Sequence, residues 1–90
     1  MPQLAVPIVN RLGMHARAAA KFVGLASQFR SDVFVSRNGR EVNGKSIMGV
    51  MMLAAAKGTE VEIRTDSADD SEQALEALCD LIANRFGEET

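Results

Sequence analysis

The chain has 90 residues, of which 47% are hydrophobic and 24% are charged, so it is long enough for one small core and shows no sign of disorder. A net charge of −2 and an aromatic content of 4% argue against nucleic-acid binding, which favours a basic surface and stacking aromatics. The longest apolar run, residues 47–56, is too short for a membrane span, and no signal segment opens the chain. The lone Cys79 excludes an internal disulfide. We expect a monomeric cytoplasmic protein with a single domain over residues 1–90 and no cofactor.

The predicted elements begin with an edge strand and an amphipathic helix. Residues 4–9 are apolar and β-prone, but Pro7 has no backbone N–H, so this strand should lie at the edge of a sheet. Residues 10–13 break the pattern. From Ala16 onward, apolar residues recur at helical spacing and predict a helix whose buried side carries Ala19, Phe22, Val23, Ala26 and Phe29.

A hairpin and a short helix should follow. Val33 and Val35, with the polar Asp32 and Ser36 on either side, predict a strand. The Asn38-Gly39 pair is a strong signal for a two-residue turn, leading into a partner strand around residues 40–42. Ser46 can cap a short helix that runs to about Ala55.

The last third of the chain predicts one more strand and a final helix. Residues 60–64 alternate between charged and apolar, which indicates a strand buried on one face. Ser67, with Asp70 three residues further on, is an N-terminal helix signature. An apolar stripe then predicts a helix ending near Gly87, formed by Leu75, Leu78, Ile82 and Phe86. The order β-α-β-β-α-β-α with half-buried strands predicts an α+β domain of two layers.

The main candidate for a functional residue is the single histidine. His15 follows Gly13 and stands where the first helix should begin, so the amides of Ala16, Arg17 and Ala18 should lack intrahelical acceptors. These amides, the helix dipole and the Arg17 guanidinium together favour an anion such as phosphate. A neutral imidazole nitrogen can attack phosphorus and form a phosphoramidate. The alternative is a solvated loop histidine that happens to lie beside a basic residue.

A second motif points to a different activity. Residues 39–46, Gly-Arg-Glu-Val-Asn-Gly-Lys-Ser, match the phosphate loop G-x-x-x-x-G-K-[ST] of nucleotide-binding proteins. That interpretation competes with the hairpin turn at Asn38-Gly39, which places Glu41 and Val42 in a strand. The predicted order also lacks the parallel strands on which such sites are built, so nucleotide hydrolysis is disfavoured. One histidine and one cysteine cannot assemble a zinc site unaided, and we expect no metal.

Methionines gather on the short helix. Met48, Met51 and Met52 lie there, and Met14 precedes the histidine. Methionine at helical spacing is often part of a core, but a helix this short cannot bury every face. Some of Ile47, Met48 and Met51 should therefore be exposed as an adaptable apolar patch suited to several partners.

Two stretches resemble a known family. Residues 10–17, Asn-x-x-Gly-Met-His-Ala-Arg, resemble the phosphohistidine signature of HPr, the histidine-containing phosphocarrier family of the bacterial phosphoenolpyruvate-dependent phosphotransferase system. Residues 42–51 resemble its second signature, around a regulatory serine, and the similarity extends over residues 4–86. Ala18 stands where the family usually has proline. The resemblance implies an open-faced β-sandwich, in which three helices cover one face of a four-stranded antiparallel sheet of order 1-4-2-3.

The resemblance also implies a function. His15 would accept a phosphoryl group on Nδ1 from enzyme I and pass it to IIA proteins or domains, in the sugar or the nitrogen branch, as a carrier rather than a stand-alone enzyme. Ser46 would be phosphorylated by HPr kinase/phosphorylase, which links the chain to carbon catabolite regulation. Arg17 would contact the phosphoryl group. The surface for partners would comprise Met14, Ile47, Met48 and Met51. The alternative is a non-catalytic regulatory module that binds through Ser46 and the methionine-rich helix.

Overall fold

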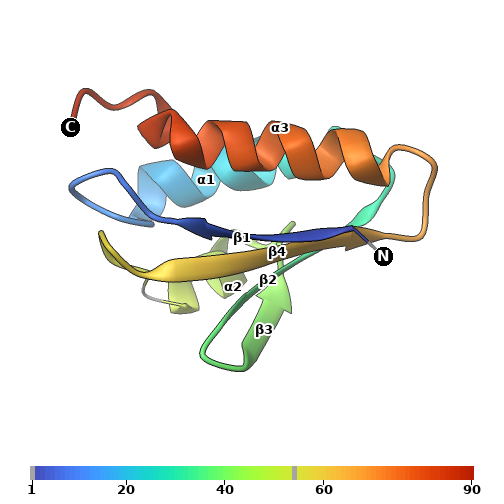
Figure 1. Ribbon diagram of the computed structural model, residues 1–90, viewed down its shortest axis with the longest axis horizontal. Coiled ribbons are helices and arrows are strands. Elements are labelled where there is room, and N and C mark those ends of the chain that lie inside the picture. Colours follow the sequence, from blue (N-terminus) through green and yellow to red (C-terminus); the bar gives the residue numbers. More distant parts are fainter. Residues whose placement is uncertain (1, 54) are drawn as a thin grey trace.

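The computed structural model describes residues 2–53 and 55–90, which form an antiparallel sheet with helices packed on one face. The sheet has the order β1-β4-β2-β3 and consists of β1 (Gln3–Pro7), β2 (Asp32–Arg37), β3 (Arg40–Asn43) and β4 (Glu60–Asp66). The helices are α1 (Ala16–Ala26), α2 (Ile47–Met52), α3 (Ser71–Ala83) and the short 3-10 helix η1 (Arg85–Gly87). In Figure 1, α1 and α3 lie side by side across the sheet, while α2 packs against α1 and β3. The predicted open-faced α+β sandwich and its strand order are confirmed.

The sheet buries one face, as the alternation in the sequence predicted. In β4, Val61 and Ile63 are buried, whereas Glu60 and Glu62 are exposed. β1 lies at the edge, where Pro7 pairs opposite Glu60 and needs no N–H on its outer side. The covered face packs against the helices in one core, whose fully buried large side chains include Phe22, Val33, Val35, Val50, Leu78, Ile82 and Phe86.

The hairpin between β2 and β3 has the predicted turn. Asn38 and Gly39 both adopt left-handed backbone angles, with φ of 53° and 80°, and the flanking residues pair directly across the turn. Glu41 and Val42 lie within β3. The residues that match a nucleotide phosphate loop therefore begin with a hairpin turn and continue as a strand, which excludes a loop wrapped around phosphates.

Two helices end earlier than predicted. α1 stops at Ala26, three residues before Phe29, where Phe29 N bonds back to the carbonyl of Ala26 at 3.2 Å in a tighter turn. α2 ends at Met52, with Leu53 as its C-cap, whereas we expected about Ala55. Residue 54, within that expected extension, lies outside the described residues. Within the described ranges, no helix combines the length and the apolar character that a bilayer crossing requires.

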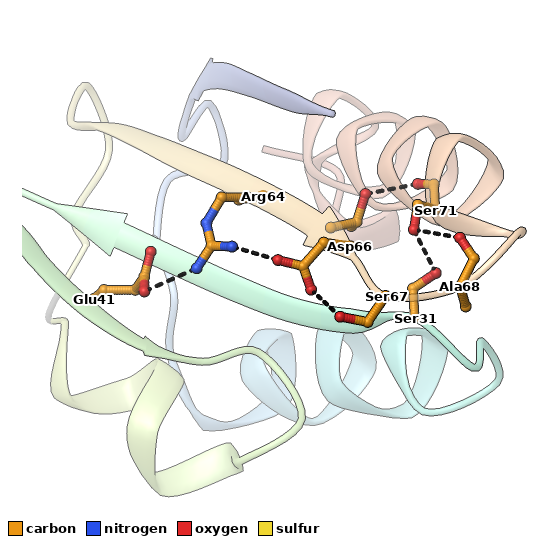
Figure 2. Close-up of polar contacts among 8 residues, drawn as sticks. Ser31, Glu41, Arg64, Asp66, Ser67, Ala68 and Ser71 are labelled. Carbon is orange, nitrogen blue, oxygen red and sulfur yellow. Dashed lines mark hydrogen bonds and ion pairs between the residues drawn. The ribbon is translucent and has the colours of Figure 1, made fainter. Parts of the chain in front are cut away.

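The start of α3 differs from the predicted one. Ser67 lies before the helix with a φ of 70°, and Asp70 is the N-cap. The Asp70 carboxylate does not cap its own helix; it accepts hydrogen bonds from the backbone amides of Arg30 at 2.8 Å and Ser31 at 3.0 Å. Figure 2 shows Ser71 beside Ser31, their hydroxyl oxygens 2.9 Å apart. The prediction of Ser67 as the cap was wrong because these bonds across the fold fix the helix start at Ser71.

The chain after α3 also departs from the prediction of one helix reaching Gly87. α3 ends at Ala83, and Arg85 and Phe86 then adopt left-handed angles with φ of 58° and 53°. This reversal still buries the Phe86 ring in the core, so the apolar stripe was read correctly although its last member lies outside the helix. The turn directs the C-terminal segment back toward the start of α1.

Candidate functional site

The start of α1 is left open by its own N-cap residue. His15 has an extended backbone, with φ −78° and ψ 178°, and its carbonyl accepts the first intrahelical bond from Ala19 N at 2.8 Å. The His15 side chain makes no capping bond. Among the described residues, the amides of Ala16, Arg17 and Ala18 have no hydrogen-bond acceptor. Donors and the positive end of the helix dipole therefore remain available to an anion.

The predicted phosphate ligands differ in accessibility. Ala16 and Arg17 are exposed, whereas Ala18 is fully buried. An anion from solvent can therefore reach the first two amides far more readily than the third, and burial argues against the additional donor expected at Ala18. The Arg17 guanidinium has no hydrogen-bond or ion-pair partner within residues 2–53 and 55–90. It is free to move toward a bound anion.

The turn before His15 requires glycine. Gly13 has a φ of +67°, and a Cβ atom there would lie 2.5 Å from the carbonyl oxygen of Ala55. The amide of Met14 donates to that same oxygen at 2.8 Å, which ties the turn to the segment that follows α2. The close approach of the two backbones sets where His15 leaves the turn, and a side chain at residue 13 would separate them.

The imidazole of His15 is bound by a residue from the other end of the chain. Its Nε2 forms a hydrogen bond with Glu88 Oε2, and both side chains are only partly exposed, at 27% and 19%. Asn10 Nδ2 donates to Glu88 Oε1 at 3.0 Å and to the Gly13 carbonyl at 2.8 Å. The pKa of Glu88 is lowered, first by the bond from Asn10 and then by that from His15. An ionised carboxylate only accepts, so this contact requires a hydrogen on Nε2.

The C-terminal segment that carries Glu88 is anchored at several points. Phe86 is buried, and its carbonyl accepts a hydrogen bond from Lys21 Nζ at 2.7 Å. The main-chain oxygen of Thr90 accepts from the amide of Arg11 at 2.9 Å. The sequence analysis missed Glu88 because 73 positions separate it from His15 and no local pattern joins them. The one usable signal was Phe86, an apolar residue next to the expected end of the last helix, whose burial draws the following segment toward the core.

Ser46, the second candidate for modification, caps its own helix. Its Oγ accepts a hydrogen bond from Gly49 N at 3.1 Å, and its amide donates to Asn43 O at 3.1 Å. The residue is half-buried. The serine hydroxyl is thus already engaged at the start of α2, in contrast to the His15 ring at the start of α1.

The methionine patch lies on the outer side of α2. Val50 is buried, as expected for the inner side, and the exposed residues are Ile47 at 44%, Met48 at 73%, Met51 at 40% and Met52 at 56%. Met52 was not among the predicted surface residues. Met14 is 6% exposed and packs in the core, so it has little surface to offer a partner, contrary to the predicted role. We define the α2 patch as Ile47, Met48, Met51 and Met52.

Other reactive groups of the chain lie apart from this site. Cys79 on α3 is half-buried, and desolvation by burial raises the pKa of its thiol, which favours the neutral and less reactive form. In the part of the chain that the structure describes, no group of three or more His, Cys, Asp or Glu side chains could hold a metal ion.

The fold is a small α+β domain with an open-faced sheet, and its first helix starts with amides that have no acceptor among the described residues. A family model described as "PTS HPr component phosphorylation site" matches residues 3–84. The phosphocarrier protein HPr of Neisseria meningitidis serogroup A is 58% identical over 88 residues, 98% of each chain. That of Pseudomonas aeruginosa is 55% identical over 89 residues, again 98% of each. The crystal structure of HPr-C-His from Thermoanaerobacter tengcongensis superposes with a TM-score of 0.95, at 44% identity and full coverage of both chains.

The chain therefore belongs to the HPr family, the phosphocarrier proteins of the phosphotransferase system. The resemblance seen in residues 10–17 and 42–51 is confirmed.

Proposed function

We propose that His15 carries the phosphoryl group of this phosphocarrier. It accepts the group on Nδ1 from phospho-enzyme I and passes it to a IIA protein or domain. The observation that carries this proposal is the open start of α1, where a partly exposed imidazole stands beside two accessible amides that lack acceptors. A carboxylate on Nε2 leaves the other ring nitrogen as the nucleophile.

The same geometry suits a group that must be held briefly. The Nδ1 lone pair forms the bond to phosphorus while the bond to the donor breaks, and the new phosphoryl oxygens lie near the amides of Ala16 and Arg17 and within reach of the Arg17 guanidinium. Charge-assisted hydrogen bonds contribute roughly 1.5–3 kcal/mol each. A few exposed donors stabilise the phosphoryl group without making its release slow, and the alignment of donor and acceptor comes from the partner complex.

We propose the α2 patch as the surface that enzyme I and the IIA proteins share. Its exposed methionines can adapt to differently shaped partners. The bond from Met14 N to Ala55 O joins the end of this region to the turn before His15, so a partner on α2 lies close to the site. Phosphorylation of Ser46 by HPr kinase/phosphorylase would add a charge of about −1.5 to −2 beside the patch. Desolvating that charge would oppose docking without unfolding α2.

We further propose that the chain acts as a cytoplasmic monomer of one domain over residues 1–90. Family membership and the absence of a membrane-spanning helix among the described residues support this proposal. The sequence and the site fit the sugar branch and the nitrogen branch equally, since both use the same phosphohistidine chemistry.

A labelling experiment tests the proposed role of His15. The wild type, His15→Ala and Glu76→Gln proteins are incubated with labelled phosphoenolpyruvate and enzyme I, then treated with acid. We expect an acid-labile label on wild type and on Glu76→Gln, a variant of an exposed α3 residue that makes no contact described for the site, and none on His15→Ala. A regulatory module that uses only Ser46 and the α2 patch would show equal, negligible labelling of all three, and that result would refute the proposal.

A further inference from the structure

We propose that Glu88 is a positioning residue for His15, which holds the imidazole with its hydrogen on Nε2 and thereby leaves Nδ1 as the attacking nitrogen. This inference rests on the proposed role of His15 as phosphoryl acceptor and extends it to the C-terminal segment. It starts from the hydrogen bond between His15 Nε2 and Glu88 Oε2.

The carboxylate is itself held in place from the turn that precedes the histidine. Asn10 is fully buried, and its Nδ2 donates one hydrogen to Glu88 Oε1 and the other to the Gly13 carbonyl. Both partners are acceptors, so the orientation of the amide is determined, and its Oδ1 has no partner among the described residues. Asn10 therefore links the position of Glu88 to the glycine turn from which His15 emerges.

The two nitrogens of the ring are in different environments. Nε2 is bound to the carboxylate, while Nδ1 has no hydrogen-bond partner within the described ranges. A neutral imidazole carries one hydrogen, and the carboxylate acceptor fixes it on Nε2. The lone pair is then on Nδ1, and attack at phosphorus needs no prior loss of a proton.

The carboxylate also matches the charge that develops during transfer. When Nδ1 bonds to phosphorus and the bond from phosphorus to the donor breaks, the ring gains positive charge that is shared with the Nε2–H group. A carboxylate on that group stabilises the charge, as carboxylates do for histidines that ligate metals through the other nitrogen. When the phosphoryl group leaves for the next acceptor, the electron pair returns to Nδ1 and the hydrogen remains on Nε2.

The position of Glu88 depends on anchors that lie outside the site. Burial of the Phe86 ring and the bond from Lys21 Nζ to the Phe86 carbonyl hold the segment before it. The bond from Arg11 N to the Thr90 oxygen holds the segment after it. The carboxylate that contacts the His15 ring is therefore carried by a segment whose backbone is anchored both before and after Glu88.

The test compares Glu88→Ala and Glu88→Gln with Glu89→Gln, whose residue is the exposed neighbour on the same segment. The first measurement is the ¹⁵N shifts of the His15 ring in unphosphorylated protein. The second is the rate of phosphorylation by phosphoramidate, a small donor whose P–N bond breaks to release ammonia and which needs no protein partner. Thermal unfolding checks that each variant is folded.

We expect a ring hydrogen fixed on Nε2 in the wild type and in Glu89→Gln, with equal rates for the two. In Glu88→Ala the ring shifts should move toward those of exchanging tautomers, and the rate should fall about 10- to 100-fold. Glu88→Gln keeps an acceptor for Nε2 but loses the charge, so it should retain the ring shifts and show a smaller fall in rate.

Two results would overturn the inference: a wild-type ring with its hydrogen on Nδ1, or a Glu88→Ala protein that is phosphorylated as fast as the wild type. The second leaves the proposed function standing, since His15 would still accept the group. A wild type that phosphoramidate and enzyme I both fail to label would refute the proposed function instead, whatever the ring shifts of the variants.

Discussion

The chain contains two helix starts that carry a candidate for phosphorylation, and they are built in opposite ways. At α2, the Ser46 hydroxyl accepts a bond from Gly49 N and so satisfies its own helix. At α1, the His15 ring is bound to Glu88, a residue from the far end of the chain, and caps nothing. The amides at the start of α1 are therefore available to an external anion, whereas an amide at the start of α2 is bound by the side chain of its own N-cap residue.

Under the proposed function, this difference would separate a carrier site at His15 from a regulatory site at Ser46. A phosphoryl group that is transferred repeatedly is best bound by donors for which no existing hydrogen bond must first break. The amides of Ala16 and Arg17 at the start of α1 are such donors. A phosphoryl group on Ser46 would have to displace or replace an existing cap bond. Its effect would then be exerted on partners that approach the α2 patch rather than on the helix.

The largest loss of folding stability is expected from Gly13→Ala, because Gly13 forms the turn that positions His15. The left-handed backbone costs an alanine about 1–2 kcal/mol, and overlap with the Ala55 oxygen adds roughly 1–3 kcal/mol. Chemical denaturation measures the loss. Gly39→Ala is the matched control, because it has the same sign of φ, +80°, but open space around its Cβ. Equal losses for the two variants would show that the contact with Ala55 is unimportant.

Arg17→Ala should affect transfer and leave stability unchanged. The guanidinium is exposed and has no partner among the described residues, so the free energy of unfolding should stay within about 0.5 kcal/mol of wild type. Loss of one charge-assisted bond to the phosphoryl group should slow labelling about 10- to 100-fold. Arg17→Lys, which keeps the charge but loses the planar fork, should lie between. Labelling of Arg17→Ala at the wild-type rate would remove Arg17 from the site.

Ser46→Ala should lower the free energy of unfolding by about 1 kcal/mol, because it removes the side chain that caps α2. Ser46→Asp restores an acceptor at the N-cap and adds charge, so its melting temperature should stay near that of wild type while enzyme I binds more weakly. Thermal denaturation and calorimetric titration with enzyme I measure the two quantities. Large destabilisation of Ser46→Asp with unchanged binding would contradict a switch that acts on docking.

The smallest effect concerns the third helix start and depends on pH. The pKa of Asp70 is lowered by the hydroxyl of Ser31 and by the backbone amide of Arg30. A carboxyl whose pKa is lower in the folded state stabilises the protein above the pKa of the unfolded chain, and this contribution is lost as the pH falls through the folded-state pKa. The stability advantage of wild type over Asp70→Asn should therefore shrink on acidification.

The control for this measurement is Asp69→Asn. Asp69 is highly exposed and forms an ion pair with the Arg30 guanidinium at the surface, where such a pair contributes little. Denaturant midpoints for both variants between neutral and acid pH give the comparison. If the Asp69 variant shows the same pH dependence as the Asp70 variant, the hydrogen bonds of Asp70 to Arg30 and Ser31 are not its cause.

Much of the fold could be predicted because local rules and the tertiary structure agree. The Asn38-Gly39 turn, the alternation along β4 and the edge position of β1 each follow from one or two residues whose preferences nothing else opposes. The open helix start at His15 could also be predicted locally, because a glycine turn followed by a helical pattern places the start of α1 there.

The parts that could not be predicted depend on contacts between distant residues. α3 starts at Ser71 rather than after Ser67 because the Asp70 carboxylate accepts hydrogen bonds from two amides in the segment between α1 and β2. Glu88 reaches His15 only because Arg85 and Phe86 adopt left-handed angles that such residues rarely take. No periodicity in the sequence predicts this reversal of the chain. Burial of the Phe86 ring offsets the conformational cost of the left-handed angles.

The uncovered side of the sheet has its own consequence. Phe34 on β2 lies under the guanidinium of Arg64, 4.2 Å from its ring centroid, and Figure 2 shows that guanidinium between Glu41 and Asp66. The aromatic ring that could make this side of the sheet bind other proteins is thus covered by a partly exposed ionic cluster. Encounters that begin there should dissociate quickly, which leaves the exposed apolar side chains of the α2 patch as the more favourable docking surface.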